Sequence, residues 1–289
     1  MNELVFINGE YTPMAQATVS VLDRGFLFGD AVYEVVRCYK RRPFALQEHL
    51  DRLERSLEGV LLEIPYPRRD FEEICHTLLQ RSQLEQSTIY FEISRGVAPR
   101  KHAFPEDAKP TVVAFPVPYV PPPAEVIEKG GRAITLPDNR WGRCDLKTVC
   151  LLPNILARET AKRQGVAEAI FLGPDQVVYE GTGSNVFYVK ENVLYTHPLH
   201  PKILPGITRG VALRLAPPLG LDVCETPRTL NDFLQADEVF ITGSSREFQS
   251  VTWIDNKPIA GGRPGPWTQK LYQAFLDYAA RQCGLESCY

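Results

Sequence analysis

The segment "PVPYVPPP" (residues 116–123) decides how the chain is divided. Five of its eight residues are proline, which cannot continue a helix because it lacks a backbone N–H and clashes with the preceding turn. The segment is therefore expected to be an extended, semi-rigid connector. We take residues 119–123 as a linker between a smaller domain (1–118) and a larger domain (124–289).

The residues before the linker show strand patterns interrupted by helix patterns. Asn8-Gly9, between "LVFI" and "EYTP", predicts a tight hairpin. A second hairpin is predicted where "AVYEVVRCY" (31–39) turns at residues 40–43 into "FAL". Apolar residues recur at helical spacing over 47–60 and 70–82, and "STIYFEISRG" and "PTVVAFPVP" follow as strands. This order predicts a small α/β domain.

The residues after the linker are richer in strand patterns. The predicted strands are "RAITLP", "EAIFLG", "VVYEGTGSNVFYVK", "NVLYTHP" and "EVFITGS". Helices are predicted over 151–164, 207–217 and 266–282, from Pro or Gly expected at their starts and Gly expected at their ends. The fold class is therefore α+β, with a larger β-rich second domain and covering helices.

Composition limits the classes of partner. The chain has 289 residues and a formal net charge of -3, so no polybasic surface indicates nucleic acid or anionic lipid as a partner. Its start, "MNELV", lacks the features of a targeting segment, and no apolar run approaches the roughly 20 residues of a membrane span. We expect a cytoplasmic protein.

The cysteines and histidines do not indicate a metal site. Seven cysteines are scattered along the chain without a Cys-x-x-Cys motif, which favours reduced thiols over a disulfide framework. His197 and His200 are close in sequence, but the prolines beside them exclude a helix that would align them. No metal is expected.

Two stretches of the second domain could bind a phosphate. In "ILPGITRGVALRL" (203–215) a helix begins at Ile207 and Thr208, where free backbone N–H groups favour an anion. "ITGSSRE" (241–247) is a hydroxyl-rich loop that could also bind phosphate or simply turn. "EGTGSNVF" (180–187) does not fit a dinucleotide loop, because a strand and not a helix follows it.

Two stretches carry cations suited to chemistry. In "GVAPRKHAFP" (96–105), Arg100 and His102 are either surface cations or donors that bind a carboxylate. In "RWGRCDLKTVCLLPN" (140–154), Lys147 stands at the mouth of an apolar run. A lysine there either extends its ammonium to water or is held for chemistry.

Taken in order, these stretches resemble class IV aminotransferases, which depend on pyridoxal 5'-phosphate and have fold type IV. The likeness is greatest to the D-amino-acid aminotransferases of that family. It extends from "LDRGFLFGDAVYEVV" through "EHLDRL", "IYFEISRG", "PRKHAFP", "RWGRCDLK", "EGTGSNVF", "LYTHP", "ILPGITR" and "ITGSSRE" to "PWTQKL". The resemblance implies a ping-pong transfer of the amino group of a D-amino acid, such as D-alanine or D-glutamate, to a 2-oxo acid such as 2-oxoglutarate.

The resemblance also assigns roles to residues that hold the cofactor. Lys147 would form a Schiff base with the cofactor and then move the proton at the substrate Cα, and Glu180 would hold the pyridine nitrogen protonated. The phosphate would be bound by Ile207, Thr208, Arg52, Ser244 and Ser245. Arg140 would lie near the phenolic oxygen, Glu168 near the lysine, and Leu204 against one face of the ring.

The substrate carboxylate would be bound by Tyr33, Arg100 and His102. In the family the loop that carries Arg100 and His102 comes from the partner subunit, so the resemblance implies a homodimer with a shared active site. Three donors on one carboxylate, with a proton delivered by Lys147 from one ring face, would select one hand of the amino acid.

Three alternatives stay open at this point. Branched-chain L-amino-acid aminotransferases and aminodeoxychorismate lyases share the cofactor stretches but differ in the Arg-x-His loop. A pyridoxal-phosphate-binding protein without turnover would need Lys147 and the phosphate site but not that loop. Thr148, Cys150 and Pro153 depart from the residues expected after the lysine, which concerns substrate breadth and rate rather than cofactor chemistry.

Overall fold

The computed structural model describes residues 4–289 and divides the chain into two compact units. The first unit comprises the described residues up to Tyr119 together with Leu146–Cys150 and Ala279–Tyr289. The second comprises Val120–Asp145 and Leu151–Tyr278. The domain prediction placed Leu146–Cys150 and Ala279–Tyr289 in the second domain, so the structure corrects it for both segments.

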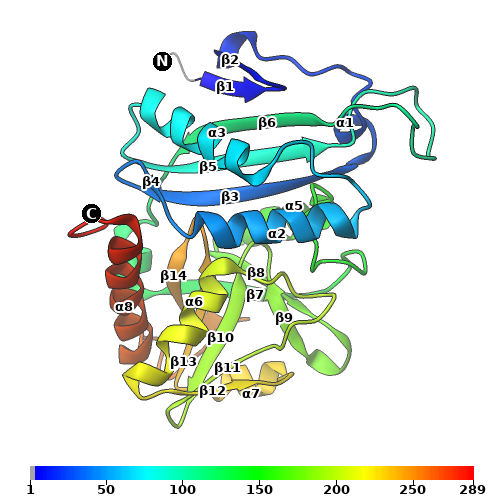
Figure 1. The fold of residues 1–289 in the computed structure, drawn as a ribbon. Coiled ribbons are helices and arrows are strands. Elements are labelled where there is room, and N and C mark those ends of the chain that lie inside the picture. The colour runs from blue at the N-terminus through cyan, green and yellow to red at the C-terminus, as the bar shows by residue number, and fades with distance from the viewer. Residues whose placement is uncertain (1–3) are drawn as a thin grey trace. The chain divides into compact units, whose positions relative to one another are not determined.

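The first unit is built on a six-stranded sheet with the order β2-β1-β6-β5-β3-β4, in which every pair is antiparallel (Figure 1). The predicted first hairpin is confirmed: Asn8 and Gly9 form its turn with φ of 49° and 101°, and the larger angle is one that glycine adopts without strain. The strands are β1 (Leu4–Ile7), β2 (Glu10–Pro13), β3 (Ala31–Tyr39), β4 (Arg42–Pro43), β5 (Gln86–Ser94) and β6 (Thr111–Pro118).

The second hairpin turns earlier than predicted. Lys40 and Arg41 form a two-residue turn with φ of 46° and 62°, and β4 is already over at Pro43. "FAL" is therefore not a strand. Phe44 is buried against Tyr39, with ring centroids 6.1 Å apart, and helix α2 begins two residues later.

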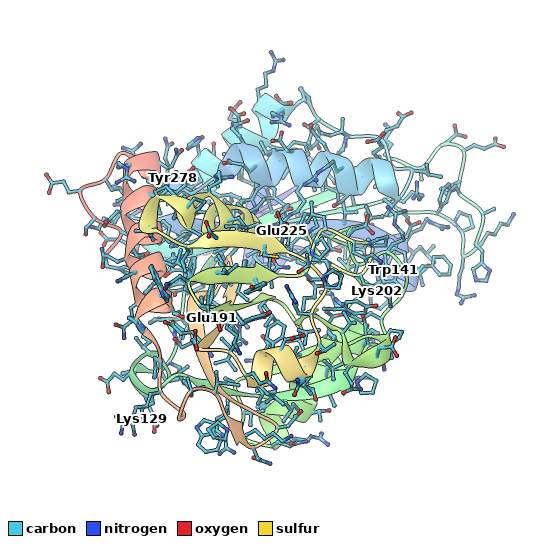
Figure 2. The ribbon with its side chains drawn as sticks, turned by 90° about the horizontal axis from the view of Figure 1, so that it is seen from below. Lys129, Trp141, Glu191, Lys202, Glu225 and Tyr278 are labelled. Atoms are coloured by element: carbon cyan, nitrogen blue, oxygen red, sulfur yellow. The ribbon has the colours of Figure 1, made fainter. Side chains whose placement is uncertain are left out.

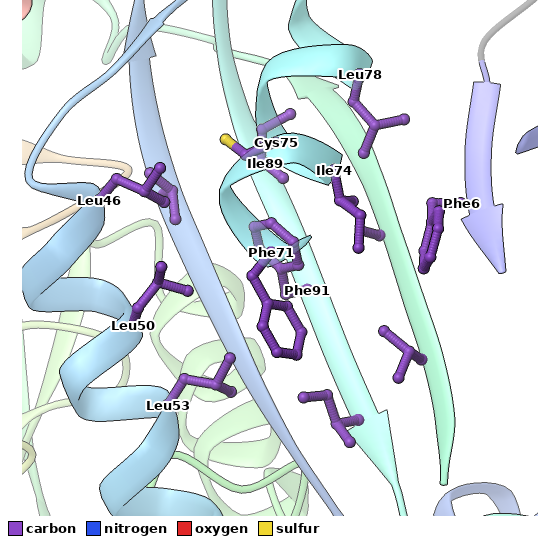
Figure 3. Close-up of a cluster of buried hydrophobic side chains, with 14 of the residues drawn as sticks. Phe6, Leu46, Leu50, Leu53, Phe71, Ile74, Cys75, Leu78, Ile89 and Phe91 are labelled. Carbon is purple, nitrogen blue, oxygen red and sulfur yellow. The ribbon is translucent and has the colours of Figure 1, made fainter. Parts of the chain in front are cut away.

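The core of the first unit lies between its sheet and two helices that follow the predicted periodicity. Leu46, Leu50 and Leu53 of α2 face the sheet, and Phe71 and Ile74 of α3 pack beside Phe6 and Phe91 (Figure 3). This core fixes the face of β3 that looks toward α2. The helices of the unit are α1 (Arg24–Phe28), α2 (Leu46–Gly59), α3 (Arg68–Arg81) and the short 3-10 helix η1 (Met14–Gln16).

The segment Leu146–Cys150 joins the first unit because it extends the edge of this sheet. The Tyr33 N–H donates to the Lys147 carbonyl at 2.9 Å, and the Val149 N–H donates to the Ala31 carbonyl at 3.2 Å. Val32 and Thr148 form an antiparallel bridge between these bonds. Backbone pairing with β3 therefore fixes the lysine.

The second unit contains a nine-stranded sheet with the order β12-β11-β10-β13-β14-β7-β8-β9, to which β15 is added beside β14. Asn185 of β10 also pairs with Glu180 of β9, so six of the strands close into a ring. The strands are β7 (Gly131–Pro137), β8 (Glu168–Leu172), β9 (Val178–Gly181), β10 (Asn185–Lys190), β11 (Val193–Thr196), β12 (Asp222–Glu225), β13 (Glu238–Gly243), β14 (Glu247–Ile254) and β15 (Lys257–Pro258).

Three of the helices of the second unit, α5, α6 and α8, were predicted from the sequence. Ala157 and Ala161 of α5 pack on Ile134 and Phe171 of the parallel pair β7 and β8. No helix within residues 4–289 has the length and apolarity needed to cross a membrane. The helices are α4 (Ala124–Lys129), α5 (Leu152–Arg163), α6 (Ile207–Leu215), α7 (Leu230–Leu234), α8 (Pro266–Cys283) and the 3-10 helices η2 (Pro174–Gln176) and η3 (Pro217–Leu219).

Candidate active site

Lys147 lies over an aromatic ring in the first unit. Its Nζ is 4.3 Å from the ring centroid of Tyr33, within the range of a cation–π contact. The Lys147 N–H donates to Ser56 Oγ of α2 at 3.1 Å, and the side chain is half-buried. Tyr33 is itself supported by Tyr90, with centroids 5.7 Å apart. The amine is thus positioned by backbone and ring together.

Arg52 belongs to a buried charged cluster that was not predicted from the sequence. Its Nε donates to Glu34 Oε1 at 2.7 Å and its Nη2 to Glu34 Oε2 at 2.8 Å. His49 Nδ1 lies 2.7 Å from the same Glu34 Oε2. All three side chains are at most 3 % exposed. Glu34 and Val36 share one face of β3, so strand alternation predicts that Glu34 faces α2.

The electrostatics of this cluster favour an ionised carboxylate. Burial raises the pKa of Glu34, but the charge and hydrogen bonds of Arg52 and His49 outweigh it and hold that pKa well below its ordinary value. Burial lowers the pKa of His49 against the opposing effect of Glu34. Glu34 is therefore a permanent anion between its two partners at neutral pH.

Arg100 and His102 lie together on the loop between β5 and β6 and are exposed. The Arg100 guanidinium is 5.3 Å from the ring centroid of Phe28, and the His102 ring meets the same phenyl edge-on at 5.6 Å. The two side chains therefore share the Phe28 ring as a common apolar contact, and their role in binding a carboxylate stays a prediction.

Glu180 occupies the point where the ring of strands in the second unit closes. It is 5 % exposed, and its Oε2 accepts from the Leu204 N–H at 2.9 Å and from Asn185 Nδ2 at 3.1 Å. Burial raises the pKa of Glu180 to about 7, although Arg140 and the Leu204 N–H act to lower it. A buried carboxyl group of this kind can share a proton with a ring nitrogen.

Arg140 has two carboxylate partners within the second unit, and its place beside the phenolic oxygen of the cofactor stays a prediction. Its Nη1 donates to Glu180 Oε1 at 2.5 Å, and its Nε and Nη2 each donate to Asp138 at 3.0 Å. Lys202 Nζ donates to the Arg140 carbonyl at 2.7 Å. Figure 2 marks Lys202 and Trp141 on this part of the second unit. Arg140 therefore holds Glu180 in place.

The start of α6 has the features of an anion site. No described side chain caps this helix, which begins at Ile207 after Gly206. A Cβ at Gly206 would collide with Asn185 Oδ1, so only glycine permits this close approach. Thr208 is 3 % exposed. The first-turn N–H groups and the Thr208 hydroxyl are thus brought beside the strand that carries Asn185.

Ser244 and Ser245 follow β13 in a loop whose backbone approaches the "EGTGSN" turn. A Cβ at Gly243 would lie 3.1 Å from the Gly183 carbonyl. Glu168 is fully buried beneath that turn, with Oε1 accepting from the Thr182 hydroxyl at 2.5 Å and Oε2 from Ser184 at 3.1 Å. Arg246 lies 3.8 Å from Glu168. Glu168 therefore holds the turn.

The predicted site residues fall into one set in each unit. The first unit brings Lys147 to Tyr33 and Arg100 to His102. The second brings Glu180 to Arg140 and Leu204, and contains Glu168, Ile207, Thr208, Ser244 and Ser245. Arg52 belongs to the first unit, so the predicted phosphate site draws on both units and its assembly stays a prediction.

Comparisons with known proteins show which family the chain belongs to. Residues 31–254 match the family model described as amino-transferase class IV. The chain is 40% identical to a D-alanine aminotransferase of Listeria monocytogenes, covering 97% of both chains, and 37% identical to one of Staphylococcus aureus, covering 96% of this chain and 98% of that protein.

Solved structures agree with this likeness. A branched-chain amino acid aminotransferase of Escherichia coli has a TM-score of 0.91 at 28% identity, over 98% of this chain and 96% of that one. The enzyme of the same name from T.th., solved with pyridoxamine 5'-phosphate, has a TM-score of 0.89 at 29% identity, over 98% and 95% of the two chains. The chain therefore belongs to the class IV aminotransferase family.

Proposed function

We propose that this aminotransferase uses pyridoxal 5'-phosphate to move the amino group of a D-amino acid to a 2-oxo acid. The observation that carries the proposal is the second unit's pairing of a buried carboxyl, Glu180, with the uncapped start of α6 through Asn185. A phosphorylated pyridine requires those two features together.

The residues fit this cofactor. Glu180 would hold the ring nitrogen, and Ile207, Thr208, Ser244 and Ser245 would bind the phosphate with Arg52. Leu204 would pack on the ring, and Arg140 would keep Glu180 oriented. When bound, the cofactor supplies an electron sink for the charge left when the substrate Cα loses its proton.

Lys147 would carry the proton at the substrate Cα. Its amine is held over Tyr33 by the contact at 4.3 Å and by the pairing of its backbone with β3. A general base must be kept within hydrogen-bond reach of the proton that it removes. The sheet edge provides that placement. Glu168, which the resemblance assigns to a place near the lysine, would hold the turn that carries Thr182 and Ser184.

Arg100, His102 and Tyr33 would bind the substrate α-carboxylate and thereby choose its hand. A fixed carboxylate leaves only one enantiomer with its Cα–H directed at the lysine. The curated relatives at 37–40% identity bear the name D-alanine aminotransferase. D-alanine and D-glutamate are the proposed donors, and 2-oxoglutarate is the proposed acceptor.

Branched-chain L-amino-acid transamination is the second candidate. The solved structures with TM-scores of 0.91 and 0.89 bear that name. Their identities of 28–29% are lower than those of the D-alanine aminotransferases, and the Arg100 and His102 pair favours the first candidate.

We also propose that the enzyme is a cytoplasmic homodimer. Both units expose large apolar side chains in groups: Val21 and Phe26 are 72 % and 73 % exposed, and Leu152 and Ile155 are 65 % and 59 % exposed. Such groups mark protein interfaces. All seven cysteines are free thiols, which fits a reducing compartment.

The experiment is an absorption spectrum of the holoenzyme before and after D-alanine, with L-valine added in parallel. We expect D-alanine, and not L-valine, to convert the cofactor band to that of its amine form. Lys147→Ala should lose roughly 10²–10⁴-fold in this conversion, whereas Lys129→Ala, on the exposed surface of α4, should match the wild type. Conversion by L-valine alone would establish the branched-chain activity instead.

A further inference from the structure

The loop that carries Arg100 and His102 is long and has no helix or strand of its own. It runs from Arg95 to Pro110, between the end of β5 and the start of β6. Ordered loops of this length inside a compact unit are uncommon and usually functional. The sequence motif "LDRGFLFGD" supplies a residue that the proposed chemistry does not use.

Arg24 of that motif binds three consecutive carbonyl groups of the loop. Its Nη1 donates to the Lys101 carbonyl at 2.6 Å and to the Ala103 carbonyl at 3.4 Å, and its Nη2 donates to the His102 carbonyl at 3.2 Å. The Arg24 side chain is 4 % exposed. A buried guanidinium therefore fixes the backbone on both sides of His102.

The other side of Arg24 is tied to the strand that carries Tyr33. Its Nε donates to Asp30 Oδ2 at 2.7 Å, directly before β3 begins. Arg95 donates to both Asp30 oxygens, at 2.9 Å and 3.1 Å. Its guanidinium also lies 3.6 Å from the ring centroid of Phe104 in the loop. Asp30 is thus the shared anion of the two cations that hold the loop.

Asp30 is ionised at neutral pH. Burial raises its pKa, but the hydrogen bonds and charges of Arg95 and Arg24 outweigh burial and leave the pKa below its ordinary value. The connection between β3 and the loop therefore consists of ionised groups over the whole neutral range.

We propose that Arg24 is a positioning residue that holds residues 101–103 in place before substrate binds, so that Arg100 and His102 present their donors in a fixed geometry. The proposal rests on the carboxylate-binding role proposed above. Its physical basis is that the ordering cost of the loop is met in folding rather than at each binding event. Lysine cannot replace Arg24, because an ammonium lacks the planar fork that reaches three carbonyls and a carboxylate together.

The test is Arg24→Lys in the holoenzyme, which keeps the charge and removes the fork. We expect KM for D-alanine to rise by up to about 100-fold, with a smaller change in kcat and an unchanged cofactor absorption band. Trypsin should cleave after Arg100 and Lys101 faster than in the wild type. Arg69→Lys, whose side chain is 86 % exposed on α3, should change neither property.

The contrary outcomes separate this inference from the proposed function. Unchanged KM and unchanged cleavage in Arg24→Lys, with KM raised in Arg100→Ala, would overturn only the positioning role. An unchanged KM in Arg100→Ala would overturn the carboxylate site and this inference with it. If Arg24→Lys does not fold, Asp30→Asn replaces it as the test variant. We expect the same rise in KM and the same faster cleavage by trypsin, each smaller than in Arg24→Lys.

Discussion

Arg140 joins two buried carboxylates, Asp138 and Glu180. Its removal would leave Glu180 without its cation and Asp138 with only Lys202, whose Nζ is 3.7 Å from Asp138 Oδ2. We expect Arg140→Met to lower the free energy of unfolding of the cofactor-free protein by about 3–5 kcal/mol, the usual cost of breaking a buried ion pair. Urea denaturation followed by circular dichroism measures this loss.

Arg143 provides a matched control three residues away. It pairs with Asp145 at 2.9 Å, and its side chain is 48 % exposed. Arg143→Met should therefore cost at most about 1 kcal/mol. Equal losses in the two variants would show that the Asp138–Arg140–Glu180 network does not stabilise the second unit.

At the scale of single residues, the motifs and the family resemblance indicate Lys147, Glu180 and Thr208 as site residues, and their chemical roles stay predictions. The sequence does not predict the contacts that hold these side chains. Glu34 was missed because it stands within an apolar strand, where a carboxylate is not expected. Its partners on α2 are His49 and Arg52, whose spacing is informative only once β3 is known to face that helix.

At the scale of elements, the packing of β3 on α2 makes stability depend on pH. His49 faces Glu34, Arg52 and Lys147, and burial lowers its pKa below the ordinary value of 6.5. As the pH falls from about 7 to about 5, the unfolded chain takes up a proton at His49 that the folded state does not, so stability is lost. We expect His49→Gln to lose less stability than the wild type over this interval.

Urea midpoints of the cofactor-free protein at several pH values measure the difference. His76→Gln is the control, because His76 is exposed on α3 and should leave the wild-type profile intact. Below about pH 4.5, protonation of Glu34 causes a further loss of stability in the wild type and in His49→Gln. The pKa of Glu34 is lowered in the folded state, so this residue stabilises the fold only where it is ionised. If the urea midpoints of His49→Gln and the wild type change with pH in parallel, buried His49 does not cause the loss of stability.

Helical periodicity predicted α2 and α3 well, because each of these helices buries one apolar stripe. The sequence did not predict β14 (Glu247–Ile254), although it lies in the middle of the second sheet. Glu247 and Gln249 are buried there, and polar side chains at buried positions hide the alternation by which a strand is recognised. The short helices α1, α4 and α7 lack the length for a periodic signal.

At the scale of the whole molecule, exposed apolar groups predict self-association. Leu152, Ile155 and Leu156 form one exposed stripe on α5, opposite the buried Ala157 and Ala161. We expect sedimentation to give twice the mass of one 32.6 kDa chain for the wild type, and the mass of one chain for Ile155→Asp.

Ile127→Asp is the matched control, because Ile127 has the same 59 % exposure on α4, outside this stripe. It should remain a dimer. A monomeric wild type would overturn the proposed assembly, and dissociation in both variants would show that added charge alone prevents it.

The division into units was the part of the fold that the sequence predicted least well. The proline segment marks the end of β6 correctly, but a break in composition cannot show that the chain returns to an earlier sheet. Leu146–Cys150 does so through backbone bonds to Ala31 and Tyr33, which carry no signature in side chains.

The placement of residues 279–289 in the first unit has a consequence for biosynthesis. Gln86 donates to the Cys288 carbonyl at 2.7 Å, and Arg37 lies 3.3 Å from the Tyr289 hydroxyl, so early strands contact late residues. During translation the nascent chain emerges from its N-terminus, and complete domains can fold as they leave the ribosome. Here the first unit gains its last contacts only after the entire second unit has been translated, so the part that is made first is completed last.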